Sequence, residues 1–472
     1  MLAASIRIVI VGGGPAGYEA ALVAAQLGAE VTVVERDGLG GACVLTDCVP
    51  SKTFIASSDV MTAVRESGAL GVRSSEPVDV SVDAGVVHGR VHELALAQSR
   101  DVRDRLVHDG VELLAGTAYF DDGRPGLARH RIVVQDDEGG RQELDADVVL
   151  IATGASPRVL PGAEPDGQRI LTWRHVYDLP ELPEQLIVVG SGVTGAEFAS
   201  AYTELGVPVT LVSSRDRVLP GEDPDAAGVL EQVFAEHGTR IVKTARAAGV
   251  TRVGDGVEVV LEDGRRLTGS HALMTVGSVP NTAQLRLDTA GIELGRGGFV
   301  EVDRVSRTSV PGVYAAGDCT GVLMLASVAA MQGRIAMWHA LGEAVTPLKL
   351  KTVSATVFTH PEIATVGLSE QAIEDGSVPA RVVTLPLATN ARAKMAGLRQ
   401  GFVKLFCRHP TGVVIGGVVV APNASELILP ITMAMQNNLT VEQLAHTFTV
   451  YPSMSGSITE AARQLMAHGD LD

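Results

Sequence analysis

The feature that most constrains the fold is a strand, glycine loop, helix and strand unit that occurs twice in the chain. In the first copy, the apolar segment IRIVIV at 6–11 leads into Gly12-x-Gly14-x-x-Gly17 and the helical pattern YEAALVAAQLG. The strand that follows, EVTVVE, ends at Glu35. This order and spacing place a pyrophosphate on a helix N-terminus and a carboxylate beside a ribose hydroxyl. The segment therefore predicts a dinucleotide-binding unit.

The second copy begins at QLIVV, and its second strand ends at Ser213 where the first ends at an acid. Its glycine loop is formed by Gly190, Gly192 and Gly195. Two such units predict two bound dinucleotides. A carboxylate would repel a 2′-phosphate, so its loss, with Arg215 and Arg217 nearby, predicts that NADPH is accepted alongside or above NADH. The alternative is that both arginines belong to a solvated turn.

Chain length and charge limit the classes of function. At 472 residues the chain is too long for a single hydrophobic core, so about three domains are expected. Its composition is that of an ordinary globular protein, and its net charge of −17 opposes binding to nucleic acid or to anionic membranes. No apolar run reaches the roughly 18 residues of a spanning helix, and the N-terminus leads into the glycine loop instead of a signal-peptide cleavage site. We therefore expect a cytoplasmic protein that binds small molecules.

Two of the four cysteines, Cys43 and Cys48, stand five positions apart in GACVLTDCVPSKT. Neither these two nor Cys319 and Cys407 have the spacing of a zinc site, so no metal is expected. Because a permanent disulfide is disfavoured in a reducing cytosol, a reversible redox pair is the functional interpretation. Pro50 is a good first helical residue, which would place Cys48 just before a helix N-terminus whose dipole stabilises a thiolate. On spacing alone, two buried and inert cysteines remain the alternative.

Several further motifs resemble those of the flavoprotein disulfide reductases, the family of lipoamide dehydrogenase, glutathione reductase and mercuric reductase. The resemblance covers essentially the whole chain. Its motifs are ATGASP at 152–157, VGSVPN at 276–281, TSVPGVYAAGD at 308–318, VFTHPEIATVGLSE from Val357 and GFVKLF from Gly401. Their number and order carry the resemblance, since any one of them alone could be accidental.

The resemblance implies an α/β protein with two Rossmann-like dinucleotide-binding domains, one for FAD and one for NAD(P), and a C-terminal α+β dimerisation domain. The FAD domain at 1–155 and 285–348 would be interrupted by the NAD(P) domain at 156–284 and followed by the dimerisation domain at 349–472. The resemblance also implies a homodimer whose two subunits share each active site. Outside the two dinucleotide units, the residues it implies at the cofactors are Thr153, Gly154, Gly277 and, for the ribityl chain of the flavin, Asp318.

The segment GGACVLTDCVPSK matches the family motif GGxCxxxxCxPSK. By that match Cys48 is the thiol against the flavin, and Cys43 is the interchange thiol that faces substrate. The same match implies that Lys52 pairs with Glu197 near the flavin N5. Asp47 replaces the usual glycine before the second cysteine, and its carboxylate is expected to raise the pKa of Cys48.

The acid–base pair at the C-terminus of the family is missing here. Members that reduce disulfides carry a His-Pro and, four residues beyond the proline, a Glu that protonate the leaving thiol across the dimer. In TVYPSMSGS, Tyr451 stands at the histidine position and Gly456 at the glutamate position. A phenol has an ordinary pKa near 10 against about 6.5 for imidazole, and loss of a positioned acid–base group typically costs about 10²- to 10⁴-fold in rate. His446 and His468 do not precede a proline and are expected at the surface or in a helix.

The sequence therefore predicts an NAD(P)H dehydrogenase that passes electrons through FAD to a quinone-type acceptor, because that transfer does not need the missing pair. The candidate catalytic residues are Cys43, Cys48, Lys52, Glu197 and Tyr451. Tyr451 either orients a quinone carbonyl or is a packing replacement with no role. The alternatives are a dihydrolipoamide dehydrogenase, since both thiols are kept; a mercuric reductase, whose C-terminal cysteine pair is absent from this sequence; and a redox sensor that binds NAD(P)H without turnover.

Overall fold

The computed structural model describes residues 5–73, 80–121, 129–376 and 378–466. Its internal contacts divide the chain into two compact units, each assembled from three separate segments of the sequence. The segments of the first unit are Met1–Thr53, His88–Arg158 and Gly277–Leu348, and those of the second are Phe54–Val87, Val159–Val276 and Lys349–Asp472.

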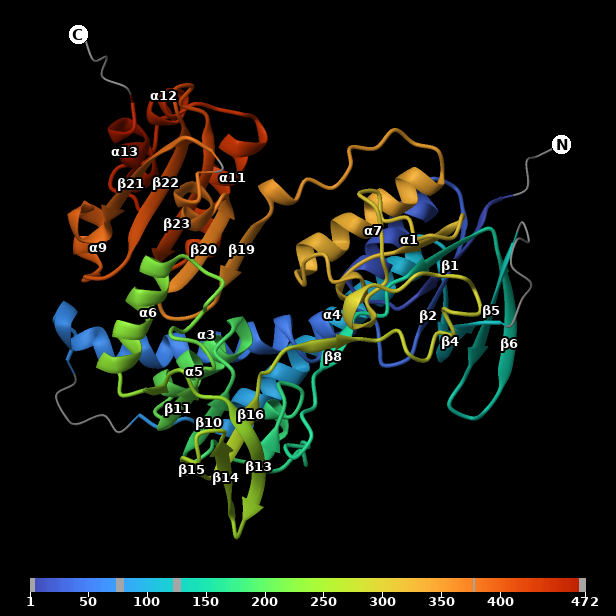
Figure 1. Cartoon of the computed structure of the whole chain (residues 1–472), viewed down its shortest axis with the longest axis horizontal. Helices are drawn as coiled ribbons and strands as arrows, with labels where there is room; N and C mark the ends of the chain where they lie inside the picture. Colours follow the sequence, from blue (N-terminus) through green and yellow to red (C-terminus); the bar gives the residue numbers. More distant parts are fainter. Residues whose placement is uncertain (1–4, 74–79, 122–128, 377, 467–472) are drawn as a thin grey trace. The chain divides into compact units, whose positions relative to one another are not determined.

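A five-stranded parallel sheet in the order β18-β7-β1-β2-β3 forms the centre of the first unit (Figure 1). Its strands, in that order, are Val313–Ala315, Val148–Ile151, Arg7–Val11, Glu30–Glu35 and Glu112–Ala115. In the central strand β1, Ile8 pairs with Val31 of β2 and with Val148 of β7. The segment IRIVIV therefore forms the strand that its apolar run predicts, covered on both faces.

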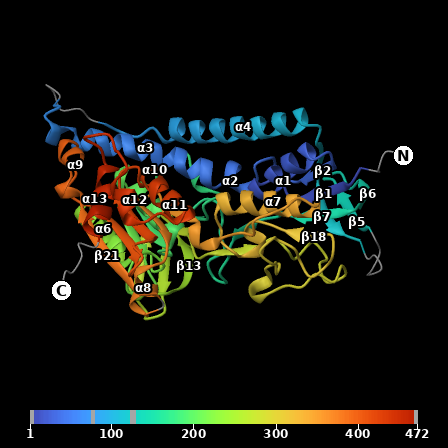
Figure 2. The ribbon, with the colours of Figure 1, turned by 90° about the horizontal axis from the view of Figure 1, so that it is seen from above.

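The two faces of this sheet are covered by different elements. Ile8 and Ile10 belong to a core with helices α1 (Pro15–Gln26), α4 (Ala84–His108) and α7 (Ala326–Ala340), and α1 and α7 lie side by side (Figure 2). Val9 and Val11 point to the opposite face, because side chains alternate along a strand. There they pack against the antiparallel sheet β4 (Thr117–Phe120), β5 (His130–Gln135) and β6 (Arg141–Ala146).

The remaining elements of the first unit carry, or lie next to, residues that the sequence predicts at the cofactors. Helix α2 (Gly41–Leu45) and helix α3 (Cys48–Glu66), which continues into the second unit, carry the two cysteines of the redox motif. Strands β8 (Ala155–Pro157) and β17 (Ser278–Pro280) pair in antiparallel fashion, and the short helix η4 (Asp318–Thr320) follows β18.

The second unit contains a second parallel sheet, in the order β12-β11-β10-β16-β9. Its strands, in that order, are Arg240–Val242, Val209–Val212, Leu186–Val189, His271–Met274 and Ile170–Leu171. Helix α5 (Val193–Glu204) follows β10, helix α6 (Pro224–Glu236) follows β11, and an antiparallel sheet is formed by β13 (Ala247–Val253), β14 (Gly256–Leu261) and β15 (Arg266–Gly269). The order β10, α5, β11 repeats the order β1, α1, β2, as the repeated glycine motif predicts.

The last third of the chain forms a five-stranded antiparallel sheet in the order β19-β20-β23-β22-β21. Its strands, in that order, are Ser354–Val357, Glu362–Gly367, Val414–Ala421, Phe402–Arg408 and Ala380–Pro386. The helices of this part are α8 (Glu370–Glu374), α9 (Ala391–Met395), α10 (Ala424–Leu427), α11 (Leu429–Gln436), α12 (Val441–Ala445) and α13 (Gly456–Gln464). The apolar faces of α9 to α13 pack with the sheet in one core. None of the helices in the described part of the chain is long and apolar enough to cross a membrane.

Lys404 is a charged residue between apolar residues of strand β22, and its side chain is 0% exposed. Its Nζ donates to Asp223 Oδ2 at 2.8 Å, to Asp225 Oδ2 at 2.7 Å and to Glu370 Oε2 at 2.6 Å. Asp223 also caps α6, because its Oδ1 accepts hydrogen bonds from the backbone N–H groups of Asp225 and Ala226. Burial alone would lower the pKa of Lys404, but the three carboxylates raise it above its ordinary value. The ammonium therefore stays charged inside the unit.

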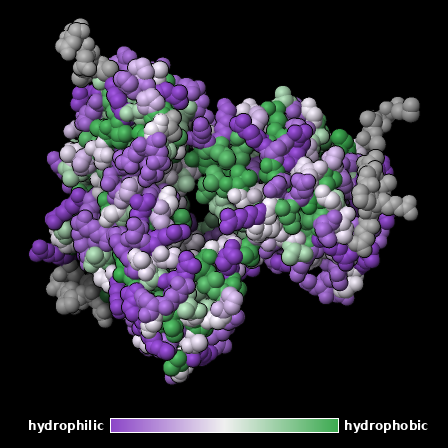
Figure 3. Space-filling model, viewed as in Figure 1, coloured by the Kyte–Doolittle hydropathy of each residue, from purple (hydrophilic) through white to green (hydrophobic). Residues whose placement is uncertain are grey.

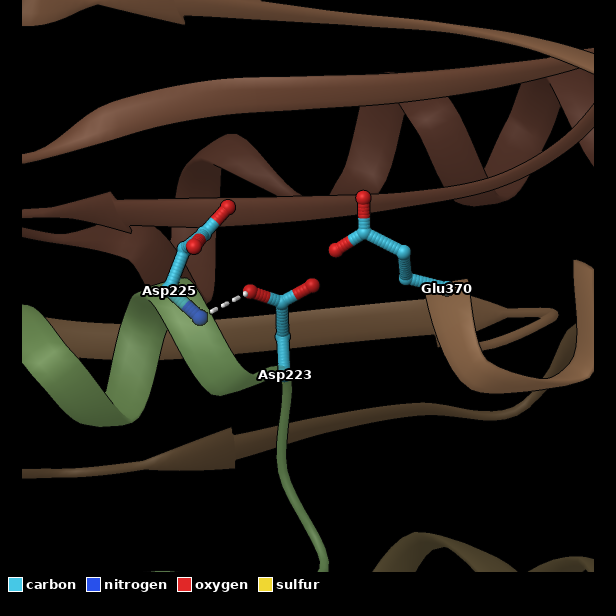
Figure 4. A group of neighbouring side chains, drawn as sticks. All are labelled: Asp223, Asp225 and Glu370. Carbon is cyan, nitrogen blue, oxygen red and sulfur yellow. Dashed lines mark hydrogen bonds between the residues drawn. The ribbon is translucent and has the colours of Figure 1, made fainter. Parts of the chain in front are cut away.

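The three carboxylates of this cluster face one another across the junction of α6 and α8 (Figure 4). Oxygen atoms of Asp223, Asp225 and Glu370 lie within 4.8 Å of one another, a grouping that could hold a cation. In this protein the cation among them is the Lys404 ammonium. Within the second unit, the cluster therefore links the start of helix α6, which follows β11 of the second parallel sheet, to strand β22 of the C-terminal sheet.

Replacement of Lys404 by Met keeps the approximate volume but leaves the buried carboxylate of Asp223, and the more exposed ones of Asp225 and Glu370, without their cation. Breaking a buried ion pair by removing one partner typically costs about 3–5 kcal/mol, so we expect Lys404→Met to lower the free energy of unfolding by that amount. Urea unfolding followed by fluorescence measures it, with Lys394→Met as the control because Lys394 is exposed on α9. Equal unfolding midpoints for Lys404→Met and the control would show that the cluster does not stabilise the unit.

Candidate functional site

The first glycine loop brings backbone segments closer together than any side chain permits. Gly12 has φ +107°, and a Cβ on it would lie 2.3 Å from the carbonyl oxygen of Ala152 at the end of β7. A Cβ on Gly17 would lie 1.9 Å from the carbonyl oxygen of Gly12. Gly14 is the N-cap of α1, and Pro15 occupies its first turn. The free N–H groups at the start of α1 therefore face outward from the carboxyl end of the sheet, where a pyrophosphate binds.

Glu35, at the end of β2, is directed toward this loop. Its Oε2 accepts a hydrogen bond from the N–H of Gly13 at 2.6 Å, and its Oε1 accepts one from the N–H of Asp37 at 2.7 Å. The carboxylate therefore lies beside the loop, at the place expected for a contact with a ribose, and also fixes the loop conformation.

The segment after β7 carries a buried polar group without a protein partner. Thr153 Oγ1 is buried and has no hydrogen-bond partner among the residues that the structure describes. The carbonyl oxygen of Thr153 accepts a hydrogen bond from Asn281 Nδ2 at 2.9 Å, and the N–H of Asn281 donates to the carbonyl of Gly154 at 3.0 Å. Gly154 and Gly277, with φ +68° and +96°, stand beside the paired strands β8 and β17.

Asp318 begins η4 in the first unit, and burial and then the charge of Asp47 raise the pKa of this carboxyl to about 6. The preceding residue, Gly317, is fixed by its N–H, which donates to the buried side chain of Gln332 at 2.9 Å. Sequence reasoning did not select Gln332 or Asn281. Asn281 could have been found because it closes the VGSVPN motif, whereas Gln332 lies in a helix with no local signal.

The two thiols of the redox motif lie together in the first unit. Cys43 on α2 and Cys48 at the start of α3 are free, half-buried and hydrogen-bonded to each other. That bond lowers the pKa of Cys43 and raises that of Cys48, burial and the carboxylate of Asp47 raise both, and Lys52 lowers both. The expected effect of Asp47 is therefore present.

The start of α3 differs from the sequence prediction. The helix begins at Cys48, two residues before Pro50, because the N–H of Ser51 already donates to the carbonyl of Asp47 at 2.7 Å. Cys48 is thus the first helical residue instead of the residue ahead of the helix. Its pKa is raised, which is opposite to the thiolate stabilisation expected from the helix dipole alone.

The second glycine loop has the same construction as the first. Gly190 has φ +114°, and a Cβ on it would lie 2.3 Å from the carbonyl oxygen of Thr275. A Cβ on Gly195 would lie 1.9 Å from the carbonyl oxygen of Gly190, and Gly192 is the N-cap of α5. Thr275 Oγ1 donates to the carbonyls of Val189 and Gly190, each at 3.0 Å. Both repeats therefore present a helix N-terminus at the carboxyl end of a parallel sheet.

Arg215 and Arg217, the two arginines predicted near a 2′-phosphate, have different surroundings in the turn after β11. Ser213 is fully buried, and its Oγ accepts from Ser191 Oγ at 2.7 Å and donates to the carbonyls of Arg215 and Arg217 at 3.1 Å. The Arg217 guanidinium donates to the carbonyl of Pro220 at 3.0 Å. Arg215 is exposed, and its guanidinium contacts no acceptor in the described part of the chain. Arg217 therefore holds the turn, whereas the contact of Arg215 with a 2′-phosphate stays a prediction.

Glu197 is buried on α5, where its Oε1 accepts a hydrogen bond from the N–H of Phe358 at 2.9 Å. Lys52 belongs to the first unit and Glu197 to the second. The pairing of the two near a flavin therefore stays a prediction.

The segment between α12 and α13 carries Tyr451, and its aromatic side chain is 85% exposed. Phe448 and Val450 beside it are also exposed, and Figure 3 shows other places where apolar residues reach the surface. Gly456 is the first residue of α13, and His446 is exposed at the C-terminus of α12, whereas His468 lies outside the described residues. Neither Gly456 nor His446 supplies an acid–base group at the position that Tyr451 occupies.

Comparison with known proteins identifies the family. The model of the pyridine nucleotide-disulphide oxidoreductases matches residues 6–333, and the model of their dimerisation domain matches residues 353–462. The chain belongs to the pyridine nucleotide-disulphide oxidoreductase family. Members bind FAD and NAD(P)H, and the dimerisation domain supports a homodimer.

Relatives within this family extend over almost the whole chain. An NAD(P)H dehydrogenase (quinone) from Mycobacterium tuberculosis is 64% identical over 99% of this chain and 95% of its own length. The crystal structure of LpdA from the same organism has a TM-score of 0.94 at 63% identity and covers 98% of this chain and 100% of that one. A dihydrolipoyl dehydrogenase from Chlorobaculum tepidum is 34% identical over 98% of this chain and 97% of its own length.

The residues of this pyridine nucleotide-disulphide oxidoreductase fit the two cofactors of the family. At the N-termini of α1 and α5 the N-cap residues Gly14 and Gly192 carry no side chain, so the backbone of each loop can contact a pyrophosphate. The unpartnered Thr153 hydroxyl beside the first loop suits a bound dinucleotide, since buried polar groups in proteins are normally hydrogen-bonded. The two parallel sheets therefore offer one site for FAD and one for NAD(P)H.

Arg215→Gln tests the assignment of Arg215 to the 2′-phosphate. We expect the KM for NADPH to rise about tenfold, because a charge-assisted contact worth about 1.4 kcal/mol is lost, while the KM for NADH stays within about twofold. Steady-state kinetics with each nucleotide measure this, with Arg252→Gln, an exposed arginine of β13, as the control. A parallel rise in both KM values would contradict the assignment.

Proposed function

We propose that this protein is an FAD-dependent NAD(P)H dehydrogenase whose electron acceptor is a quinone. The observation that carries the proposal is the exposed Tyr451 at the place of the family's histidine, followed by Gly456 at the place of its glutamate. The name of the 64% identical relative, NAD(P)H dehydrogenase (quinone), supports the same acceptor.

The chain's own residues divide the work between the two dinucleotide-binding units. The second glycine loop and Arg215 bind the pyridine nucleotide, and the first loop, Glu35 and Asp318 hold FAD. FAD, when bound, takes a hydride from NAD(P)H and passes electrons on to an acceptor. The hydroxyl of Tyr451 can donate a hydrogen bond to a quinone carbonyl in the homodimer, but a phenol does not exchange protons as an imidazole does.

The thiol pair gives a second candidate its support. Cys43 and Cys48 lie close enough to hydrogen-bond, as dithiol–disulfide exchange requires, and this favours a dihydrolipoyl dehydrogenase activity. Exchange with an alkyl disulfide also needs a proton for the leaving thiolate, and Tyr451 and Gly456 do not provide the family's donor. We therefore place the quinone first.

An acceptor panel separates the two candidates. The purified yellow holoenzyme is assayed with NADPH and with NADH against benzoquinone, lipoamide, glutathione disulfide and Hg(II). We expect benzoquinone to be reduced at least about 10²-fold faster than lipoamide, since the acid–base pair needed for the disulfide is missing. Comparable rates with lipoamide and benzoquinone would refute the proposal, and a single reduction without turnover would indicate a sensor.

A further inference from the structure

The two repeats connect the end of the second strand to the glycine loop in different ways. In the first repeat, the carboxylate of Glu35 accepts hydrogen bonds from the N–H of Gly13 in the loop, at 2.6 Å, and from the N–H of Asp37 in the following turn, at 2.7 Å. A single acidic side chain therefore joins the loop to the turn. Its charge suits a ribose hydroxyl and opposes a 2′-phosphate.

Ser213 and Ser191 stand at the corresponding positions of the second repeat. In the first repeat the N–H of Gly12 donates to the carbonyl of the residue before Glu35, at 2.8 Å. In the second, the N–H of Gly190 donates to the carbonyl of the residue before Ser213, at 3.0 Å. The repeats therefore match residue by residue. Ser213 takes the place of Glu35, and Ser191 follows Gly190 where the first repeat has a glycine.

Two hydroxyls make the same connection in the second repeat without a charge. The hydroxyl of Ser191, in the loop, donates to that of Ser213 at 2.7 Å, and both side chains are buried. Ser213 Oγ also accepts from the N–H of Arg215 at 3.1 Å and donates to the carbonyls of Arg215 and Arg217. Because a serine side chain is shorter than that of a glutamate, the second hydroxyl completes the reach between turn and loop.

The backbone of Arg215 is held at both its N–H and its carbonyl. The N–H donates to Ser213, and the carbonyl accepts from the N–H of Thr244 at 2.9 Å. The carbonyl of Ser191 accepts from the N–H of Leu219 at 2.8 Å, so the far end of the turn also returns to the glycine loop. All these residues belong to the second unit. The exposed side chain of Arg215 is therefore carried by a backbone that is fixed relative to the loop.

We propose that Ser191 and Ser213 are positioning residues that set the nucleotide specificity. Their uncharged bridge holds the backbone of Arg215 so that its guanidinium meets the 2′-phosphate of NADPH, and it leaves no carboxylate there to repel that phosphate. Ser213 acts through Arg215, because its side chain is fully buried and its hydroxyl is already bonded within the protein. The role of the two serines rests on the proposed use of NADPH, and not on the electron acceptor.

Binding of two adenosine fragments to the oxidised, FAD-containing holoenzyme tests this role without electron transfer. Calorimetric titration with adenosine 2′,5′-bisphosphate and with adenosine 5′-monophosphate, which lacks the 2′-phosphate, gives two dissociation constants. We expect Arg215→Gln to weaken binding of the bisphosphate about tenfold. Ser213→Ala should weaken it about 3- to 10-fold, as loss of a buried hydrogen bond predicts. Binding of the monophosphate should change less than about twofold in both variants.

A double-mutant cycle shows whether the serine acts through the arginine. If it does, Ser213→Ala causes little further loss of bisphosphate binding in the Arg215→Gln background, whereas independent effects would add. Ser191→Ala keeps the bonds between Ser213 and the turn, and it should show the same selective loss. This variant decides the matter if Ser213→Ala does not retain flavin, which absorbance measures.

Thr203→Val is the matched control. Thr203 is buried at the C-terminal end of α5, and its hydroxyl is bonded to that of Thr239 at the same 2.7 Å, whereas the glycine loop precedes the N-terminus of this helix. Both fragments should bind to this variant as they do to wild type.

Equal weakening of both fragments in the serine variants would overturn the proposed role, and so would additive losses in the double variant. An unchanged bisphosphate affinity in Arg215→Gln would overturn it as well, because there would be no contact to position. Failure of the wild-type enzyme to reduce benzoquinone would count only against the proposed acceptor, since neither fragment carries electrons.

Discussion

The close approach of two backbone segments in each glycine loop is the constraint on which the site depends. The carbonyls of Ala152 and Thr275 occupy the space in which a Cβ on Gly12 or Gly190 would lie. Each contact closes the loop onto the neighbouring parallel strand and turns the N-terminus of the following helix toward the carboxyl end of the sheet. Two helix N-termini prepared in this way can hold two pyrophosphates, and a hydride path needs both.

The proton supply, in contrast, departs from that of the disulfide-reducing members. Tyr451 and Gly456 stand where those members carry a histidine and a glutamate, so this chain lacks their donor of a proton to a leaving thiol. Transfer of electrons from reduced flavin to a quinone does not need that donor.

Local sequence was sufficient for those features that a short segment determines by itself. The glycine loops, the strands beside them and the position of Glu35 could be predicted because each βαβ unit is complete within about 30 residues. The family motifs then placed the cysteines and Tyr451. Ser213 was located at the right strand end, but the engagement of its hydroxyl inside the turn could not be read from the spacing.

Features that depend on distant packing could not be predicted. Lys404 reads as an interruption of an apolar strand, and its partner Asp223 lies 181 residues away, so only the folded chain shows that the two meet in the core. The start of α3 at Cys48 instead of Pro50 depends on the bond from Ser51 to Asp47, which favours earlier helix formation over the preference of proline for the first turn. Tertiary contacts therefore determine structural features, such as these, that local sequence propensity does not determine.

The most direct test of the account is to restore the missing proton donor. In the double variant Tyr451→His, Gly456→Glu, lipoamide turnover with the preferred nucleotide is compared with that of wild type at pH 7. If proton supply is what excludes disulfides, the turnover rises at least about tenfold, toward the 10²- to 10⁴-fold that a positioned acid–base group contributes. A folded, flavin-bound double variant with the same lipoamide rate as wild type would contradict the account.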